Sequence, residues 1–115
     1  MIVQIFGTLK CRDTQKAIRF FKERGIQLHF VNLAEKNISK GELRNISSKI
    51  ALNNLIDTNG KEFKKQQLEY KIYDIETELL NNSLLLKTPI VRFEKNVTVG
   101  YAQEEWKEWL KNRKV

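Results

Sequence analysis

The sequence has little of three residue types, since its 115 residues include one cysteine, one histidine and one proline. A lone cysteine excludes an internal disulfide and favours a reducing, cytoplasmic location. One cysteine with one histidine is too few for the usual metal-ligand clusters, so we expect no metal site. No apolar run approaches the roughly 20 residues of a membrane span, and the N-terminus lacks the pattern of a signal peptide. We therefore expect a cytoplasmic protein with no metal and no membrane contact.

The charge is unbalanced, with 21 lysines and arginines against 14 acidic residues and a formal net charge of +7. Such an excess favours an anionic partner without defining its class. The basic residues are dispersed, and the chain has no direct nucleic-acid motif of the aromatic and basic type. The length predicts one domain over residues 1–115.

The single cysteine lies at the first change of pattern in the chain. Residues 2–6 are rich in Val, Ile and Phe and predict a buried strand. Asp13 or Thr14 is a good N-cap for a helix that would end near Gly25. Cys11 is therefore expected on the strand-to-helix turn, at or just before the helix N-terminus.

That position favours a reactive thiol. The N–H groups at a helix N-terminus stabilise a thiolate, and Lys10 and Arg12 flank the sulfur with positive charge. A charged turn also favours a solvated sulfur, so we expect little effect of burial. Thiols in such settings have pKa values of roughly 3.5–7.5, against about 8.5 unperturbed, so we expect Cys11 below about 7.5. The alternative is an inert, buried cysteine that acts as a small hydrophobic residue.

The middle of the chain predicts a second strand followed by helices. Residues 26–33 alternate as a strand, with His29 on the polar side as an ordinary surface residue. A strand, a helix and a strand joined by short loops form a right-handed βαβ unit with parallel strands. Residues 34–86 change to helical spacing, which begins with a capping box at Ser39 and Glu42. No strand is evident there, so we expect a helical insertion.

The last third of the chain returns to strands. Residues 88–93 and 97–101 predict an antiparallel hairpin, and residues 103–111 predict a final helix with Trp106 on its apolar face. The predicted order is βαβ, helices, ββα. This is an α/β, thioredoxin-like fold with a helical insertion at approximately 34–86 between its halves.

Four stretches resemble the arsenate reductases of the glutaredoxin-coupled type and their relatives, the Spx-type regulators. The first is Cys11, six residues before Ala17 of the predicted helix. The second is a turn followed by basic residues, at 55–65. The third is a Pro-Ile segment at 87–92, and the fourth is a Val-Gly-Tyr segment at 99–101. Because these stretches span the chain at the right spacings, it is identified as a member of this family. The resemblance also implies that Pro89 follows a cis bond and, like Thr14, lies near Cys11.

The resemblance implies an enzyme in which Cys11 attacks arsenate, with glutathione and glutaredoxin as electron donor. It further implies that arginines bind the oxyanion, because a planar guanidinium neutralises it better than an ammonium. Here Lys64 stands where one arginine is expected, and Thr88 stands before Pro89 in place of another. The candidate anion-binding residues are Arg12, Lys64, Lys87 and Arg92. Solvated surface charge is an equally good interpretation of the two lysines.

The same resemblance implies a second hypothesis, a regulator that binds the C-terminal domain of the RNA polymerase α-subunit through the helical face near residues 40–56. Such regulators typically carry a Cys-x-x-Cys switch, and Thr14 occupies the second position here. The missing cysteine weakens the regulator hypothesis, and the missing arginines weaken specific arsenate reduction. We therefore favour a thiol-dependent reductase that acts through Cys11 on an oxyanion or a glutathione-linked substrate.

Overall fold

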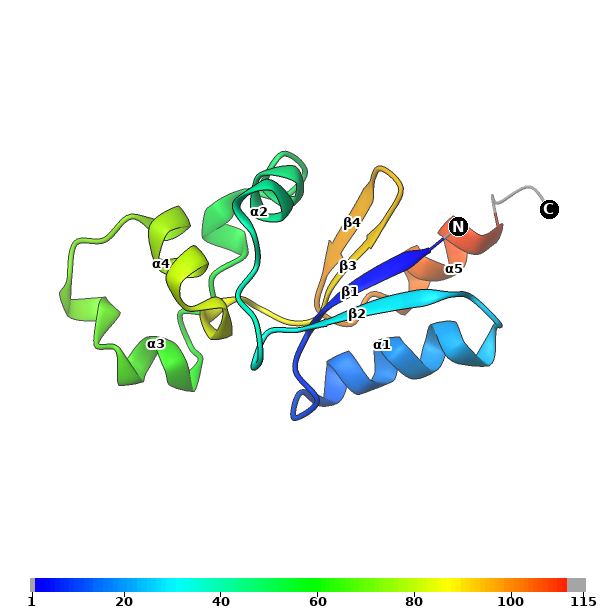
Figure 1. Cartoon of the computed structure of the whole chain (residues 1–115), viewed down its shortest axis with the longest axis horizontal. Coiled ribbons are helices and arrows are strands. Elements are labelled where there is room, and N and C mark those ends of the chain that lie inside the picture. The colour runs from blue at the N-terminus through cyan, green and yellow to red at the C-terminus, as the bar shows by residue number, and fades with distance from the viewer. Residues whose placement is uncertain (1, 112–115) are drawn as a thin grey trace.

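A computed structural model of the chain describes residues 2–111. Its strands and helices are β1 (Val3–Gly7), α1 (Arg12–Glu23), β2 (Leu28–Asn32), α2 (Lys40–Ser47), α3 (Lys61–Lys65), α4 (Ile75–Asn81), β3 (Ile90–Phe93), β4 (Asn96–Val99) and α5 (Gln103–Lys111). Figure 1 shows the sheet with α1 and α5 in one half of an elongated molecule, and α2, α3 and α4 in the other. Within residues 2–111, no helix is long and apolar enough to cross a membrane.

The four strands form one sheet in the order β2-β1-β3-β4. β1 pairs parallel with β2 and antiparallel with β3, and β3 pairs antiparallel with β4. This topology confirms the thioredoxin-like arrangement predicted from the sequence. The apolar residues of β1 explain its central place, because Val3 and Ile5 pack on one face and Phe6 packs on the other, all fully buried.

α1 and α5 cover one face of the sheet. Ala17, Phe20 and Phe21 form the buried side of α1 and pack with Trp106 of α5. Trp106 is fully buried, and its indole N–H donates to Thr98 Oγ1 over 2.8 Å, so its one polar group is satisfied. This packing fixes α1 against β1 and thereby fixes the turn between them.

The helical segment between β2 and β3 packs against the opposite face. Its core residues share a cluster with Phe6, Val31 and Ile90 of the sheet. The predicted capping box at α2 is confirmed, since Ser39 Oγ accepts from Glu42 N–H while the Glu42 carboxylate accepts from Ser39 N–H. The segment has no strand within the described residues, apart from one isolated antiparallel bridge between residues 56 and 86.

Several predicted boundaries need correction. The helix expected after Asp13 or Thr14 begins at Arg12, so Cys11 is itself the N-cap. The helical spacing predicted from Ser39 onward is interrupted, because α2 ends at Ser47 and only a short 3-10 turn, Leu52–Asn54, follows. Two serines lie at this helix end, and the hydroxyls of Ser47 and Ser48 donate to backbone carbonyls of the preceding turn. Such side-chain contacts compete with helical hydrogen bonds.

Candidate functional site

Cys11 occupies a tight turn between β1 and α1. Its N–H donates to the Thr8 carbonyl over 3.2 Å, and its carbonyl accepts the first helical N–H, from Gln15, over 3.1 Å. The side chain is partly buried. An N-cap side chain faces the N–H groups of the second and third helical residues, which are Asp13 and Thr14 here. The predicted placement at the helix N-terminus is therefore confirmed.

A second segment reaches the sulfur from the start of β3. Thr88 Oγ1 lies 3.2 Å from Cys11 Sγ and donates to it, and the Thr88 carbonyl oxygen lies 3.8 Å from the sulfur as an acceptor for the S–H. The Thr88–Pro89 peptide bond is cis, as the resemblance implied. A threonine replaces the arginine expected before Pro89, and its hydroxyl contacts the sulfur directly.

Thr14, in the first turn of α1, is fully buried. Its Oγ1 makes no hydrogen bond of ordinary geometry with the described part of the chain, so the nearby sulfur is the acceptor that it can serve. Gly7 makes room for this side chain, because a Cβ on Gly7 would lie 2.4 Å from Thr14 Oγ1. The glycine at the end of β1 therefore permits the close approach of the first turn of α1.

These contacts control the ionisation of Cys11. Burial is the largest single influence and raises the pKa of the thiol. The Thr88 hydroxyl, which donates to the sulfur, and the nearby Thr14 hydroxyl and backbone N–H groups of Thr14 and Asp13 lower the pKa, and together they outweigh burial. The pKa of Cys11 therefore lies below its ordinary value, in the direction that the sequence predicts.

The predicted cause of that shift is only half right. The helix N–H groups contribute, but the charges of Lys10 and Arg12 are not among the causes of the lowered pKa. Both side chains are exposed, so solvent screens them. The expectation of a well-solvated thiol is also wrong, because burial is the largest influence. Two threonine hydroxyls replace the flanking cations as the main stabilising contacts.

The sulfur faces an open cleft of about 600 Å³ between the sheet and the helical segment. Four segments of the chain supply the lining, which consists of Cys11, Ile50, Asn54, Asp57, Lys87, Thr88, Val99 and Gly100. The lining therefore combines one ammonium group, one carboxylate and one amide with apolar side chains. Lys87 and Asp57 are fixed near each other by two backbone bonds across the isolated bridge, Asp57 N–H to Leu85 and Lys87 N–H to Leu55.

The candidate anion-binding residues separate in the structure. Lys87 lines the cleft, whereas Arg12, Lys64 and Arg92 are not among its lining residues. Arg12 and Lys64 are exposed on α1 and α3. The Arg92 guanidinium instead donates to Gln4 Oε1 and, over 3.0 Å, to Asn45 Oδ1. The structure thus brings one of the four candidate cations to Cys11.

Sequence reasoning misses the polar residues that approach Cys11 from the helical segment. Asp57 stands in a stretch whose pattern predicts only a turn, and its carboxylate does accept from Asn59 N–H. Asn54 belongs to a short 3-10 turn that the sequence does not predict. The sequence does draw attention to Thr88, because it precedes the sole proline at a position where the family resemblance implies an arginine.

The chain matches the family model of the ArsC family over residues 6–109. The Bacillus subtilis protein YusI, described as uncharacterized, is 29% identical over 86% of this chain and 90% of its own length. Global transcriptional regulator Spx 2 of Oceanobacillus iheyensis is 30% identical over 96% of this chain and 84% of its own length.

Solved structures show the same fold. An arsenate reductase from Vibrio cholerae superposes with a TM-score of 0.78 at 19% identity, covering 94% of this chain and 97% of that protein. A glutaredoxin from Archaeoglobus fulgidus superposes with a TM-score of 0.52 at 13% identity, covering 96% of this chain and 86% of that protein. At these identities the likeness extends to the fold alone.

Proposed function

The chain belongs to the ArsC family, and on that premise we propose that it is a thiol-dependent reductase that acts on a glutathione-linked substrate through Cys11. The observation that supports this most is the hydroxyl of Thr88, which donates to Cys11 Sγ over 3.2 Å. A hydrogen bond to the sulfur favours the thiolate, which is the form that attacks. The partly buried sulfur also faces an open cleft that a peptide-sized thiol can enter.

The reaction is a pair of thiol–disulfide exchanges. The Cys11 thiolate attacks the glutathione sulfur of a mixed disulfide, a new S–S bond forms, the old one breaks, and the substrate leaves as a thiolate. The thiolate of a second glutathione then attacks the glutathione sulfur on Cys11. Oxidised glutathione leaves, and Cys11 is again a thiolate. Each step needs only one protein cysteine, which is what this chain has.

The charges of the cleft favour a zwitterionic ligand over an oxyanion. Lys87 and Asp57 both line the cleft, so it offers one positive and one negative group. Glutathione carries free carboxylates and a free ammonium, which match both groups. An arsenate ion would meet one ammonium, an opposing carboxylate and no lining guanidinium. The oxyanion substrate is therefore the weaker of the two alternatives.

The experiment is a coupled assay of reduced glutathione consumption with a glutathionylated peptide as substrate. We expect turnover by the wild-type chain, none by Cys11→Ser, and mass-spectrometric detection of a glutathione adduct on Cys11. Asp57→Asn is expected to raise KM, while Asp74→Asn, on an exposed helix cap outside the cleft, serves as the matched control. Absence of the adduct together with absence of turnover would refute the reductase proposal.

The relatives support a second candidate function, that of a regulator that binds the C-terminal domain of the RNA polymerase α-subunit. Several relatives named as global transcriptional regulators Spx match 95–97% of this chain at 24–30% identity. Thr14 stands in place of a second cysteine, so such binding would not need an internal disulfide. An NMR titration with the isolated polymerase domain tests this, with shifts expected at residues 40–56. No shift at high micromolar concentration in low salt would remove this candidate.

A further inference from the structure

The outer edge of β2 is open. β2 lies at the end of the sheet order, so only one of its two sides pairs with another strand. The Gln27 carbonyl accepts from Val3 N–H, and Leu33 N–H donates to the Gly7 carbonyl. Alternate residues of a strand direct their backbone groups to the same neighbour, so the groups of His29 and Val31 also point toward β1. The N–H and carbonyl groups of Leu28 and Phe30 therefore point away from the sheet. Within residues 2–111, these groups have no hydrogen-bond partner on that side.

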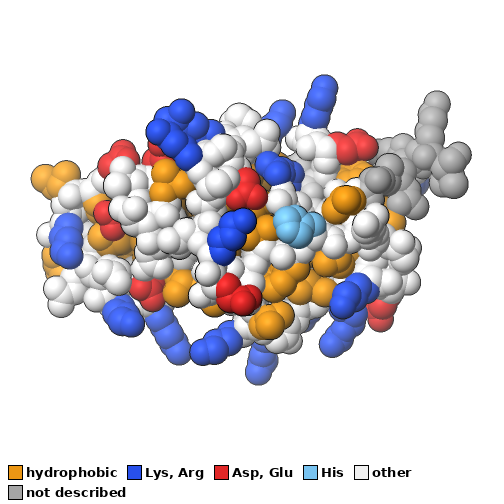
Figure 2. All heavy atoms as spheres, viewed as in Figure 1, with side chains coloured by type: hydrophobic (Ala, Val, Ile, Leu, Met, Phe, Trp, Pro, Cys, Tyr) orange, Lys and Arg blue, Asp and Glu red, His pale blue; other side chains and the backbone are white. Residues whose placement is uncertain are grey.

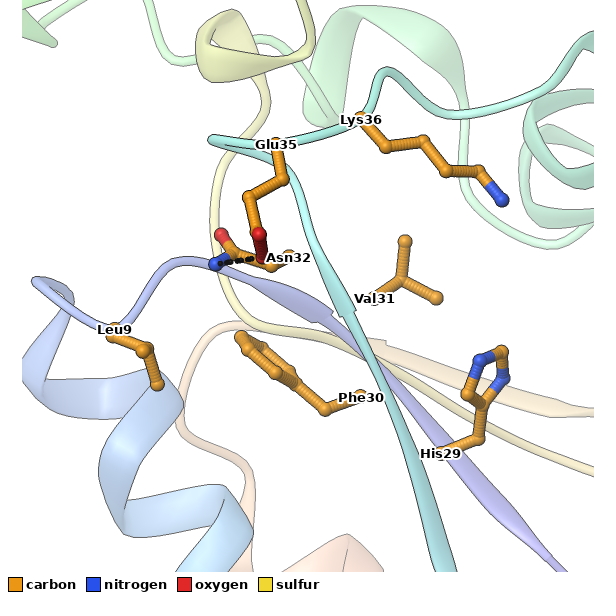
Figure 3. A pocket seen from close by; sticks show the side chains of 7 residues that line it. All are labelled: Leu9, His29, Phe30, Val31, Asn32, Glu35 and Lys36. Atoms are coloured by element: carbon orange, nitrogen blue, oxygen red, sulfur yellow. Dashed lines mark hydrogen bonds between the residues drawn. The ribbon is translucent and has the colours of Figure 1, made fainter.

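An apolar depression adjoins this edge. A cavity of about 410 Å³ runs along β2, and Figure 3 shows Leu9 and Phe30 on one side of the strand with His29 on the other. Leu9 is 57% exposed and lines two further depressions, one toward Ile18 on α1 and one toward Leu84. Leu9 and Phe30 therefore form part of a contiguous apolar surface beside the free edge of β2, and exposed apolar surface of this kind marks interaction sites.

Positive charge surrounds the depression. We define the β2-edge surface by its apolar residues Leu9, Ile18 and Phe30 and its cations Arg19, Lys22 and Lys36. The acidic residue in its lining is Glu35, whose carboxylate accepts from Asn32 over 3.1 Å. Figure 2 shows a patch of hydrophobic side chains beside the histidine, with Lys and Arg side chains at its border. None of the three cations forms an ion pair among the described residues.

We propose that the β2-edge surface docks an acidic, extended segment of a partner protein, which adds as a further strand to β2. The free groups of Leu28 and Phe30 would bond its backbone, the depression at Leu9 would take one apolar side chain, and the cations would face its carboxylates. A second copy of this chain is a poorer occupant, because it would bring the same cations to the same edge. This surface is distinct from the Cys11 cleft, whose lining residues it does not share.

The test selects a displayed library of short random peptides on the folded 115-residue chain. We expect the enriched peptides to carry an apolar residue between acidic residues. Their synthetic versions should shift the amide NMR signals of Leu28 and Phe30 and protect both amides from hydrogen exchange. Enriched peptides that instead shift the residues of the Cys11 cleft, or peptides without acidic character, would overturn the proposal, as would failure to enrich any peptide over uncoated support.

Variants separate this site from others. Leu9→Asp should weaken peptide binding roughly tenfold or more, since an apolar anchor is lost and a like charge is added. Ile72→Asp is the matched control, because Ile72 is a fully exposed apolar residue in the helical segment, outside this surface. Cys11→Ser should bind as wild type, which keeps this result independent of the reductase proposal. An equal loss of peptide affinity in Leu9→Asp and Ile72→Asp would contradict the proposed site. Dimers that form without peptide and that Leu9→Asp dissociates would show a second copy of the chain as the occupant, which would contradict the proposal.

Discussion

Replacement of Thr88 by valine removes the hydroxyl that donates to Cys11 Sγ over 3.2 Å and keeps a β-branched side chain of similar shape. A hydrogen bond to a charged group contributes about 1.5–3 kcal/mol. Cys11 is only partly buried, so solvent screening places the effect at the low end of that range. We therefore expect Thr88→Val to raise the pKa of Cys11, since it removes roughly 1.5 kcal/mol of stabilisation from the thiolate.

The assay follows the ultraviolet absorbance of the thiolate against pH, with Cys11→Ser as the blank that removes the tyrosine contribution. Thr88→Ser is the matched control, because it keeps the hydroxyl donor and should titrate close to wild type. Thr58→Val, in an exposed turn, controls for the loss of any threonine hydroxyl. An unchanged titration in Thr88→Val would refute the claim that this hydroxyl stabilises the thiolate. A rise of equal size in Thr88→Ser would assign the effect to packing instead.

Three further changes test other parts of the account. Gly7→Ala should destabilise the fold by roughly 1–3 kcal/mol, as measured by chemical denaturation, because its Cβ would overlap the Thr14 side chain. Adding Thr14→Ala should relieve part of that loss. Additive losses of stability in the double variant would contradict the contact between residues 7 and 14. Ser39→Ala should lower the free energy of unfolding by about 1 kcal/mol through loss of the α2 cap, and an unchanged denaturation midpoint would argue against it. Arsenate reduction with glutathione and glutaredoxin should stay below roughly one turnover per second, and Lys87→Ala should lower it further, because Lys87 is the cation that lines the Cys11 cleft; faster turnover would contradict this interpretation of the cleft.

Short-range patterns in the sequence predict the parts of the molecule that depend on neighbours in the chain. β1, the helix after it and the final hairpin follow from apolar periodicity and turn residues, and so does the position of Cys11 at the N-terminus of α1. The α2 capping box is predictable because its two partners are only three residues apart. A single sequence displays such neighbours directly.

The contacts that define the site join residues far apart in the chain. Thr88 approaches Cys11 from 77 residues away, and no local pattern encodes that contact. Arg92 is a plausible anion ligand from its position on a strand near Pro89, but the register Gln4 to Arg92 places it beside Gln4 and Asn45 instead. Side chains alternate across a strand, so a residue close in sequence to the site can face the other way.

The central claim is that the folded chain stabilises the thiolate of Cys11 and thereby makes this residue reactive. The most direct test is the pH dependence of its alkylation by iodoacetamide, measured on the folded chain and on the urea-unfolded chain. Cys11 is the single cysteine, so the reaction reports one site. We expect a lower midpoint for the folded chain than for the unfolded one, because the hydrogen-bond donors around the sulfur lower the pKa of Cys11. A folded midpoint at or above the unfolded value would make Cys11 an inert, structural residue, and the reductase proposal would then be wrong.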